Sequence, residues 1–260
     1  WLDEHVEVLG QPGFAVCGQD RIQCFYLGAG WKDKCLWRLD GGSLEDLFDL
    51  KAAAGMSWIR SWDFGWRAIE PEEGRFDWRL QDRIVDESLR RGIRVMPVLG
   101  SCWQHTDKIP WDPKPLPEWI MKDCPSVPVA SQSEARKGYM TCLPPVERWT
   151  RYVTACVERY KGRITHWEML NEPNMFLTPE QYVTYMRATY EAMKRADKDA
   201  KLVGLCATGD LNGNILAFMR DCFKRGALDC CDLVSFHPYS ARLDSAVPVS
   251  AEEMTAQVKA

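Results

Sequence analysis

Apolar residues recur along the chain with two alternating periods. Five segments keep the helical spacing that produces one apolar face, and each is followed by a short run of β-branched and aromatic residues. We predict helices at about 43–54, 79–91, 144–161, 178–198 and 215–225. We predict strands at 57–64, 93–99, 164–170, 201–207 and 232–239.

Residues that favour helix starts and stops mark the same segments. Two predicted helices begin with capping pairs, Ser43–Asp46 and Thr178–Gln181, in which each side chain can bond the other residue's backbone N–H. Four helices end at a glycine, which reaches positive φ at low cost. These glycines are Gly55, Gly92, Gly162 and Gly226.

The alternation of helices and strands predicts a parallel sheet with helices outside it. Neither G-x-G-x-x-G nor G-x-x-x-x-G-K-[ST] occurs, which argues against the common nucleotide-binding sheets. An α/β fold of the (β/α)8 TIM barrel type fits better, with functional groups at the carboxyl ends of the strands. Pro97 is an objection to the strand at 93–99, because proline cannot donate to the ladder; a bulge would accommodate it.

The predicted barrel occupies residues 41–260 and stops short of eight strands. A further strand at 21–28 would be the sixth, so we expect truncation after the sixth strand and its helix; residues 1–40 are otherwise unplaced. The stretch 101–142, rich in Pro, Trp and polar residues, is predicted to be a long active-site loop. The chain starts without Met and ends inside a predicted helix, so we expect a fragment. The rest of the barrel would come from the same longer chain or from a partner chain.

Composition excludes some classes of function. The 260 residues include 37 acidic and 33 basic ones, a net charge of −4 without long runs of one sign, which argues against a nucleic-acid or anionic-membrane partner. No window of about 18 apolar residues predicts a transmembrane helix. The eleven cysteines are odd in number and follow no metal-binding or redox spacing, so we predict no metal or cofactor. They also favour a mostly reduced chain and, on that ground, a cytoplasmic location.

Polar side chains gather at the ends of three predicted strands. Asn171 and Glu172 follow the strand at 164–170, and a carboxylate there can act as a general acid; a solvated turn residue is the alternative. Arg60, inside the first strand, needs a carboxylate partner if it is buried. His237 and Tyr239 are two residues apart and share one face of the last strand. His237 alone is more typical of a core histidine than of a catalyst.

Three segments carry a resemblance to a known group of enzymes. WRAIEPEEGRFDW (66–78), WEMLNEPN (167–174) and VSFHPY (234–239) resemble segments of the clan A glycoside hydrolases, retaining glycosidases built on the (β/α)8 barrel. The last segment is most similar to the β-xylosidase-type families. The resemblance covers roughly residues 43–240.

The resemblance implies a role for each strand-end residue. Glu172 would be the general acid/base, and Asn171 would bond the sugar 2-hydroxyl group. Arg60 and Tyr239 would position the nucleophile, and His237 would line the substrate site. The implied activity is retaining cleavage of β-glycosidic bonds in oligo- or polysaccharides.

The chain departs from the family pattern at two places. Many members have a histidine at the end of the third strand, where this chain has the segment 100–103. Either this chain lacks that match or His105 takes the role. The nucleophile is a Glu ending the seventh strand of the family, which we expect beyond residue 260. Glu168 shares a strand face with Glu172 but would lie about 13 Å lower on an extended strand, beyond the 5–5.5 Å of a retaining pair. The other carboxylates that we considered are in loops or helices: Glu70, Glu72, Glu73, Glu252 and Glu253.

Aromatic residues at the strand ends could stack on sugar rings. Trp62, Trp103 and Trp111 are candidates, with packing as the alternative for each, and we assign Trp103 to the substrate site. A carbohydrate-binding pseudoenzyme on the same barrel is the competing interpretation, and a Glu ending the next strand would argue against it. We expect the 260-residue chain by itself to be poorly stable and inactive, since a barrel without two strands has open edges.

Overall fold

The computed structural model describes residues 13–16, 22–27, 36–100, 103–105, 116–130, 138–210 and 214–239. The chain divides into two compact units. Trp1–Ile59 and Arg79–Arg94 form the smaller unit, and Arg60–Trp78 and Val95–Ala260 form the larger.

The smaller unit contains an antiparallel sheet in which β2 lies between β1 and β3. Its elements are β1 (Gly13–Val16), β2 (Ile22–Leu27), β3 (Leu36–Gly42), α1 (Leu44–Ala53) and α3 (Arg79–Arg90). The strand predicted at 21–28 is therefore present, but it belongs to this antiparallel sheet and is not a barrel strand. Residues 17–21 and 28–35 are too few for a parallel crossover, which needs a dozen residues or more.

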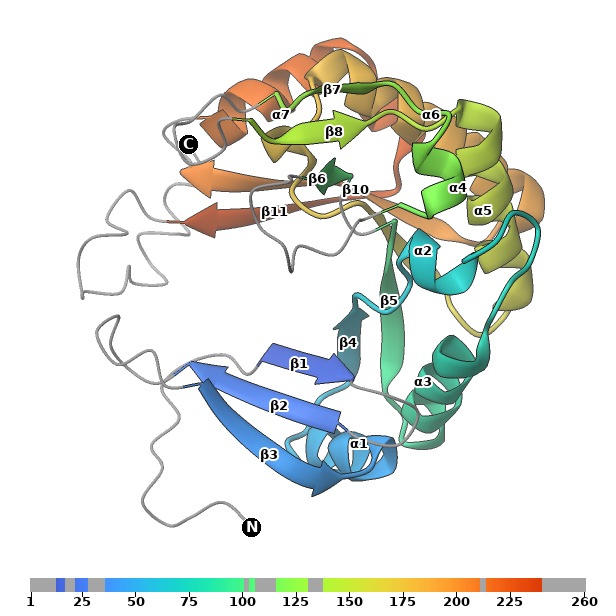
Figure 1. The fold of residues 1–260 in the computed structure, drawn as a ribbon, viewed down its shortest axis with the longest axis vertical. Coiled ribbons are helices and arrows are strands. Elements are labelled where there is room, and N and C mark those ends of the chain that lie inside the picture. Colours follow the sequence, from blue (N-terminus) through green and yellow to red (C-terminus); the bar gives the residue numbers. More distant parts are fainter. Residues whose placement is uncertain are drawn as a thin grey trace. The chain divides into compact units, whose positions relative to one another are not determined.

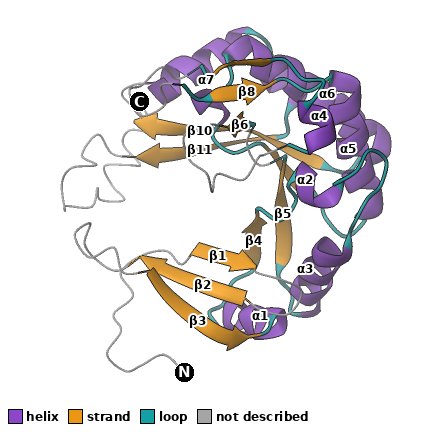
Figure 2. Cartoon of the chain, in the orientation of Figure 1, coloured by secondary structure: helices purple, strands orange, loops and turns teal. Residues whose placement is uncertain are grey.

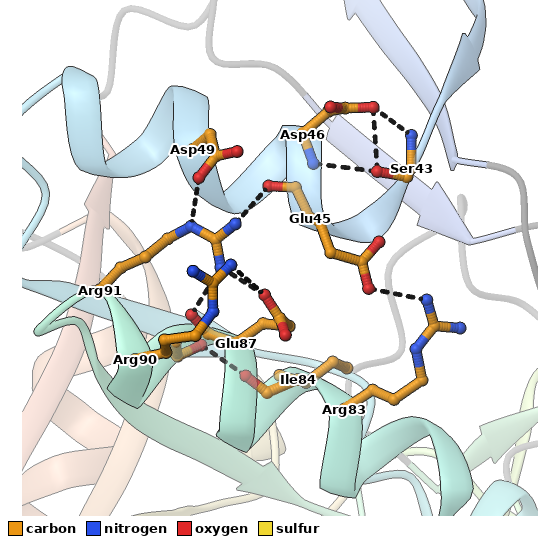
Figure 3. Close-up of polar contacts among 10 residues, drawn as sticks. Ser43, Glu45, Asp46, Asp49, Arg83, Ile84, Glu87, Arg90 and Arg91 are labelled. Carbon is orange, nitrogen blue, oxygen red and sulfur yellow. Dashed lines mark hydrogen bonds and ion pairs between the residues drawn. The ribbon is translucent and has the colours of Figure 1, made fainter.

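Helices α1 and α3 are joined by charged side chains (Figure 3). Arg91 directly follows α3, and its Nε donates to Asp49 Oδ1 at 2.6 Å. Its Nη2 donates to the Glu45 carbonyl oxygen at 2.9 Å, and its Nη1 contacts Glu87. Arg83 adds a bond to Glu45 Oε1 at 3.1 Å. The Arg91 side chain is only 6% exposed, and its bonds hold α1 against α3.

The parallel sheet has the strand order β11-β10-β9-β5-β4. Its strands are β4 (Trp58–Ser61), β5 (Arg94–Leu99), β9 (His166–Met169), β10 (Lys201–Asp210) and β11 (Leu233–Tyr239). β10 pairs in parallel with β9 and β11, and β5 pairs in parallel with β9. The predicted parallel arrangement of the five strands is confirmed.

Helices of the larger unit pack beside one another along this sheet (Figure 1). The three long ones are α5 (Val146–Arg159), α6 (Pro179–Ala196) and α7 (Asn214–Lys224). The unit also contains the short α2 (Trp66–Ile69) and the 3-10 helices η2 (Pro173–Met175) and η3 (Ala227–Cys230). α5 packs on α6, α6 packs on α7, and α7 packs on β10. Among the described residues, no helix has both the length and the apolar character that crossing a bilayer requires.

The predicted helix boundaries are confirmed by the backbone. Both capping pairs form two-way capping boxes at the starts of α1 and α6. The four glycines at the helix ends have φ between 72° and 83°. Pro97 does lie inside β5, but the described pairing with β9 starts at Val98, so that ladder does not need the missing N–H.

The segment predicted as one long loop contains regular structure where it is described. It holds α4 (Glu118–Met121) and a small antiparallel sheet of order β6-β8-β7. The strands are β6 (Gln104–His105), β7 (Ser126–Pro128) and β8 (Met140–Cys142). Figure 1 labels all three, and Figure 2 shows β6 and β8 coloured as strands. Strands of two or three residues are too short to show alternation of apolar and polar positions, so the sequence did not reveal them.

The core of the larger unit is rich in aromatic rings. Trp66 stacks on Tyr152 with a centroid distance of 5.1 Å, and Trp149 packs against both rings. Beside them the fully buried carboxylate of Glu70 accepts bonds from the Trp66 indole, the Gly74 N–H and a guanidinium. These contacts explain the buried charge as a structural one.

Candidate active site

The end of β9 turns sharply and presents Glu172. The strand ends at Met169, and the next residues leave the extended conformation: Leu170 has φ 59° and Glu172 has φ 50°. Positive φ is uncommon for residues other than glycine and marks positions worth attention. Pro173 then starts η2, with Glu172 as its N-terminal cap. The estimate of about 13 Å between Glu168 and Glu172 assumed an extended strand, so it does not apply.

A bulge in β10 accepts a hydrogen bond from the backbone of Glu172. The pairing of β10 with β11 shifts register between Leu205 and Ala207, leaving Cys206 as the extra residue. Cys206 has φ 42°, and its carbonyl oxygen accepts the Glu172 N–H at 3.1 Å. The bulge thus provides a backbone acceptor at the point where the β9 segment turns.

The second Asn of the Asn-Glu-Pro-Asn sequence fixes the same turn. Asn174 Nδ2 donates to the carbonyl oxygen of Thr208 at 2.8 Å, and Asn174 Oδ1 accepts the Thr208 N–H at 2.9 Å. These two bonds hold η2 against β10, so the backbone of Glu172 is held on both sides.

Arg60 connects three strands through one guanidinium group. Its Nε bonds Glu168, and its Nη2 donates to Asn171 Oδ1 at 2.9 Å and to Cys206 Sγ at 3.3 Å. Glu168 is 1% exposed and also accepts from Ser235 Oγ at 2.8 Å. The carboxylate partner that a buried arginine requires is therefore present, and it is Glu168.

His237 lies between the carboxylate of Glu172 and the thiol of Cys206. Its Nδ1–H donates to Glu172 Oε1 at 3.0 Å, and its Nε2 is 3.5 Å from Cys206 Sγ. Hydrogen bonds to Cys206 and to Glu172 raise the pKa of His237 from 6.5 to about 10, against the opposing effect of burial. This raised pKa favours the imidazolium form, which places positive charge beside Glu172.

Four of the residues predicted for the site thus belong to one connected network. Arg60 and Asn171 are bonded to each other, Glu172 and His237 are bonded to each other, and Cys206 contacts both pairs. Tyr239 is the last residue of β11, but its side chain lies outside the described residues.

Trp103 does not have the exposed ring face that sugar stacking needs. Its side chain is fully buried, with its ring edge-on to Trp149 at 5.1 Å and to Tyr185 at 4.7 Å. The assignment to the substrate site is therefore corrected to core packing. Trp62 is 49% exposed, with the Arg60 guanidinium 5.0 Å from its ring centre. Trp111 lies outside the described residues, as does the His105 side chain.

Sequence reasoning missed three residues that hold this network together. Ser235 could have been found, because it is two residues before His237 and so faces the same side of β11. Asn174 is the last residue of the WEMLNEPN segment, but no role was predicted for it. Cys206 gave no signal, since a bulge is set by pairing between strands and not by local pattern.

Known proteins match parts of this chain in sequence. The model of the glycoside hydrolase 42 family, described as beta-galactosidase, matches residues 38–199, more than half of the chain. The beta-galactosidase BgaA of Thermus sp is 28% identical over 136 residues, which are 50% of this chain and 18% of that protein. Endo-1,4-beta-xylanase A of Halalkalibacterium halodurans is 25% identical over 105 residues, 40% of this chain and 24% of that protein. The matched part of the chain thus spans no more than about a quarter of these relatives.

Solved structures support the fold. A family 39 glycoside hydrolase from Bacteroides cellulosilyticus WH2 superposes with a TM-score of 0.56 at 18% identity, covering 85% of this chain and 45% of that one. Xylanase B from Clostridium stercorarium F9 gives a TM-score of 0.52 at 18% identity, covering 78% of this chain and 60% of that one. The predicted α/β barrel is confirmed as a partial (β/α) barrel.

The family match, the parallel sheet and the strand-end residues lead to one assignment. The predicted resemblance to clan A glycoside hydrolases is confirmed, and the chain belongs to the glycoside hydrolase 42 family.

Proposed function

We propose that the natural protein containing this chain is a retaining glycosidase that cleaves β-glycosidic bonds. The observation that carries the proposal is the pairing of Glu172 with His237 at the carboxyl ends of β9 and β11, beside the bonded pair Arg60 and Asn171. In barrel enzymes the chemistry takes place at this end of the strands. A pure binding protein has little use for a charged network around one carboxylate.

Glu172 serves as general acid and then as general base. It protonates the leaving oxygen while a second carboxylate attacks the anomeric carbon, and it then activates the water that releases the sugar. The charge of the nucleophile helps to keep Glu172 protonated in the first step. Once the glycosyl ester has formed, the imidazolium form of His237 stabilises the carboxylate that the second step requires. Asn171, oriented by Arg60, bonds the sugar 2-hydroxyl group, and Tyr239 helps to position the nucleophile, which is expected beyond residue 260.

The substrate class follows the named relatives. Because they are beta-galactosidases and endo-1,4-beta-xylanases, β-galactosides and β-1,4-xylo-oligosaccharides are the substrates to try first. Trp62, half-exposed beside Arg60, is the candidate for stacking on one of the sugars.

The Glu172→Gln variant of the natural protein tests the mechanism. We expect turnover of substrates with poor leaving groups to fall about 10²–10⁴-fold, the usual contribution of general acid–base catalysis. Azide should partly restore turnover of activated aryl glycosides, because it replaces the water that Glu172 no longer activates. The matched control is Glu158→Gln, an exposed carboxylate on α5, which should leave kcat unchanged. Normal turnover in Glu172→Gln would refute the assignment, and sugar binding without hydrolysis by the unmodified protein would favour the pseudoenzyme.

A further inference from the structure

Three neighbouring strands bring together a mixed set of metal-binding atoms. Glu168 lies on β9, Cys206 on β10 and His237 on β11, and one donor atom from each lies within 4.8 Å of the other two. Thiolate sulfur, imidazole nitrogen and carboxylate oxygen are the ligands that Zn²⁺ takes in proteins. Three protein ligands leave a fourth position for water.

The spacing of the two stronger donors matches a tetrahedral zinc ion. Cys206 Sγ and His237 Nε2 are 3.5 Å apart. Bond lengths of about 2.3 Å to sulfur and about 2.0 Å to nitrogen place the two atoms roughly 3.5 Å apart at the tetrahedral angle. A cation can therefore enter between them with little movement of either side chain.

The orientation of the imidazole is also that of a ligand. A metal-bound histidine almost always donates its other ring N–H to a carboxylate or carbonyl oxygen, which fixes the tautomer. His237 Nδ1–H donates to Glu172 Oε1 at 3.0 Å, which leaves Nε2 facing Cys206.

One cationic group already occupies this position. The Arg60 guanidinium contacts both Cys206 Sγ and Glu168. Cys206 and Glu168 are buried, whereas the Arg60 and His237 side chains are 26% and 27% exposed and give access from solvent. An entering cation would have to displace Arg60, which also holds Asn171.

We propose that Glu168, Cys206 and His237 form a site for a thiophilic divalent cation such as Zn²⁺, which binds in competition with the Arg60 guanidinium. The site goes beyond the glycosidase proposal and does not depend on it, because cation binding is measured without substrate. If the protein is also a glycosidase, the cation inhibits it, since Arg60 is displaced from Asn171 and His237 is held by the metal.

Cobalt provides a direct test on the natural protein after treatment with a chelator. We expect one equivalent of Co²⁺ to bind with the charge-transfer absorption of a cobalt–thiolate bond, and Zn²⁺ to abolish that absorption. Cys206→Ser should lose the band, whereas Cys222→Ser, which changes a buried cysteine on α7, should keep it. The same band in Cys206→Ser would overturn the proposal, because another cysteine would then be the ligand.

A second measurement needs no variant and covers the case in which Cys206→Ser fails to fold. Crystals of the natural protein grown with Zn²⁺ should show an anomalous peak between Glu168, Cys206 and His237. Peaks only at other positions, or none, would overturn the proposal.

Discussion

At the scale of single residues, Arg60 is the cation that neutralises the buried carboxylate of Glu168. Replacing Arg60 by Met leaves Glu168 with the Ser235 hydroxyl as a remaining partner. Breaking a buried ion pair costs about 3–5 kcal/mol, and we expect about 3 because Arg60 is partly exposed. Urea denaturation of the natural protein measures this free energy.

A double variant separates the cost of leaving the Glu168 charge unpaired from other effects of replacing Arg60. Arg60→Met with Glu168→Leu removes both charges, so it should recover most of the lost stability. A double variant no more stable than Arg60→Met alone would show that the uncompensated charge of Glu168 is not the cause.

Two glycines with the same backbone conformation have different surroundings. Gly100 has φ 71°, and a Cβ there would meet the Trp149 ring at 2.7 Å; Gly74 has φ 76° and nothing within 4 Å. Gly74→Ala should cost about 1–2 kcal/mol for the left-handed backbone alone. Gly100→Ala should cost roughly 1–3 kcal/mol more, because the added methyl overpacks the core. Thermal denaturation of the two variants checks the difference; equal shifts would mean that Trp149 moves aside freely.

At the scale of elements, Asp232 joins the end of α6 to the start of β10. Its carboxylate accepts the Leu202 N–H at 2.9 Å and pairs with Lys194 and Lys201. Although burial acts in the opposite direction, these partners hold the pKa of Asp232 below its usual value of 3.8.

The lowered pKa of Asp232 gives a stability difference with a definite pH range. A group whose pKa falls on folding stabilises the native state above its unfolded pKa, and this contribution disappears as the pH falls through the folded pKa. Asp232→Asn should therefore be less stable than the unmodified protein at pH 7, and the two should converge below about pH 3.8. Denaturant midpoints measured from pH 7 to pH 3 test this, and a constant difference across the range would contradict it.

Elements with strong local signals could be predicted, and those defined by pairing could not. The capping pairs and terminal glycines bounded α1 and α6 because their effects act within one turn. The short strands β6, β7 and β8 carry no periodic pattern, and β2 was given the wrong partners. Pairing partners depend on contacts between distant residues, which local periodicity does not report.

At the scale of the whole molecule, the sequence predicted the barrel and four connected site residues, but not how they are connected. Arg60, Asn171, Glu172 and His237 were found from a recognised pattern at strand ends. Their link through Cys206 required the fold, because the contacts span up to 146 positions in the chain. Trp103 was misassigned for the same reason, since its burial depends on helices that follow it in the sequence.

The behaviour of the isolated 260-residue chain is a prediction at this scale. β11 lies at one end of the five-stranded sheet, and its Leu233 and Val234 are 44% and 38% exposed. Exposed apolar edge strands promote association between molecules. We expect the chain expressed alone to self-associate in size-exclusion chromatography and to lack activity on aryl glycosides that the natural protein cleaves. A monodisperse, active chain would refute this.

The bulge in β10 makes position 206 a place where the stability of the fold and its function favour different residues. Leu205 and Cys206 adopt left-handed conformations in succession, a backbone cost of about 1–2 kcal/mol each for residues with a Cβ. Glycine at 206 would remove one of these costs, but it would also remove the sulfur that contacts Arg60 and His237. Selection for heat tolerance alone would therefore favour glycine at position 206, whereas selection for the activity would retain the thiol.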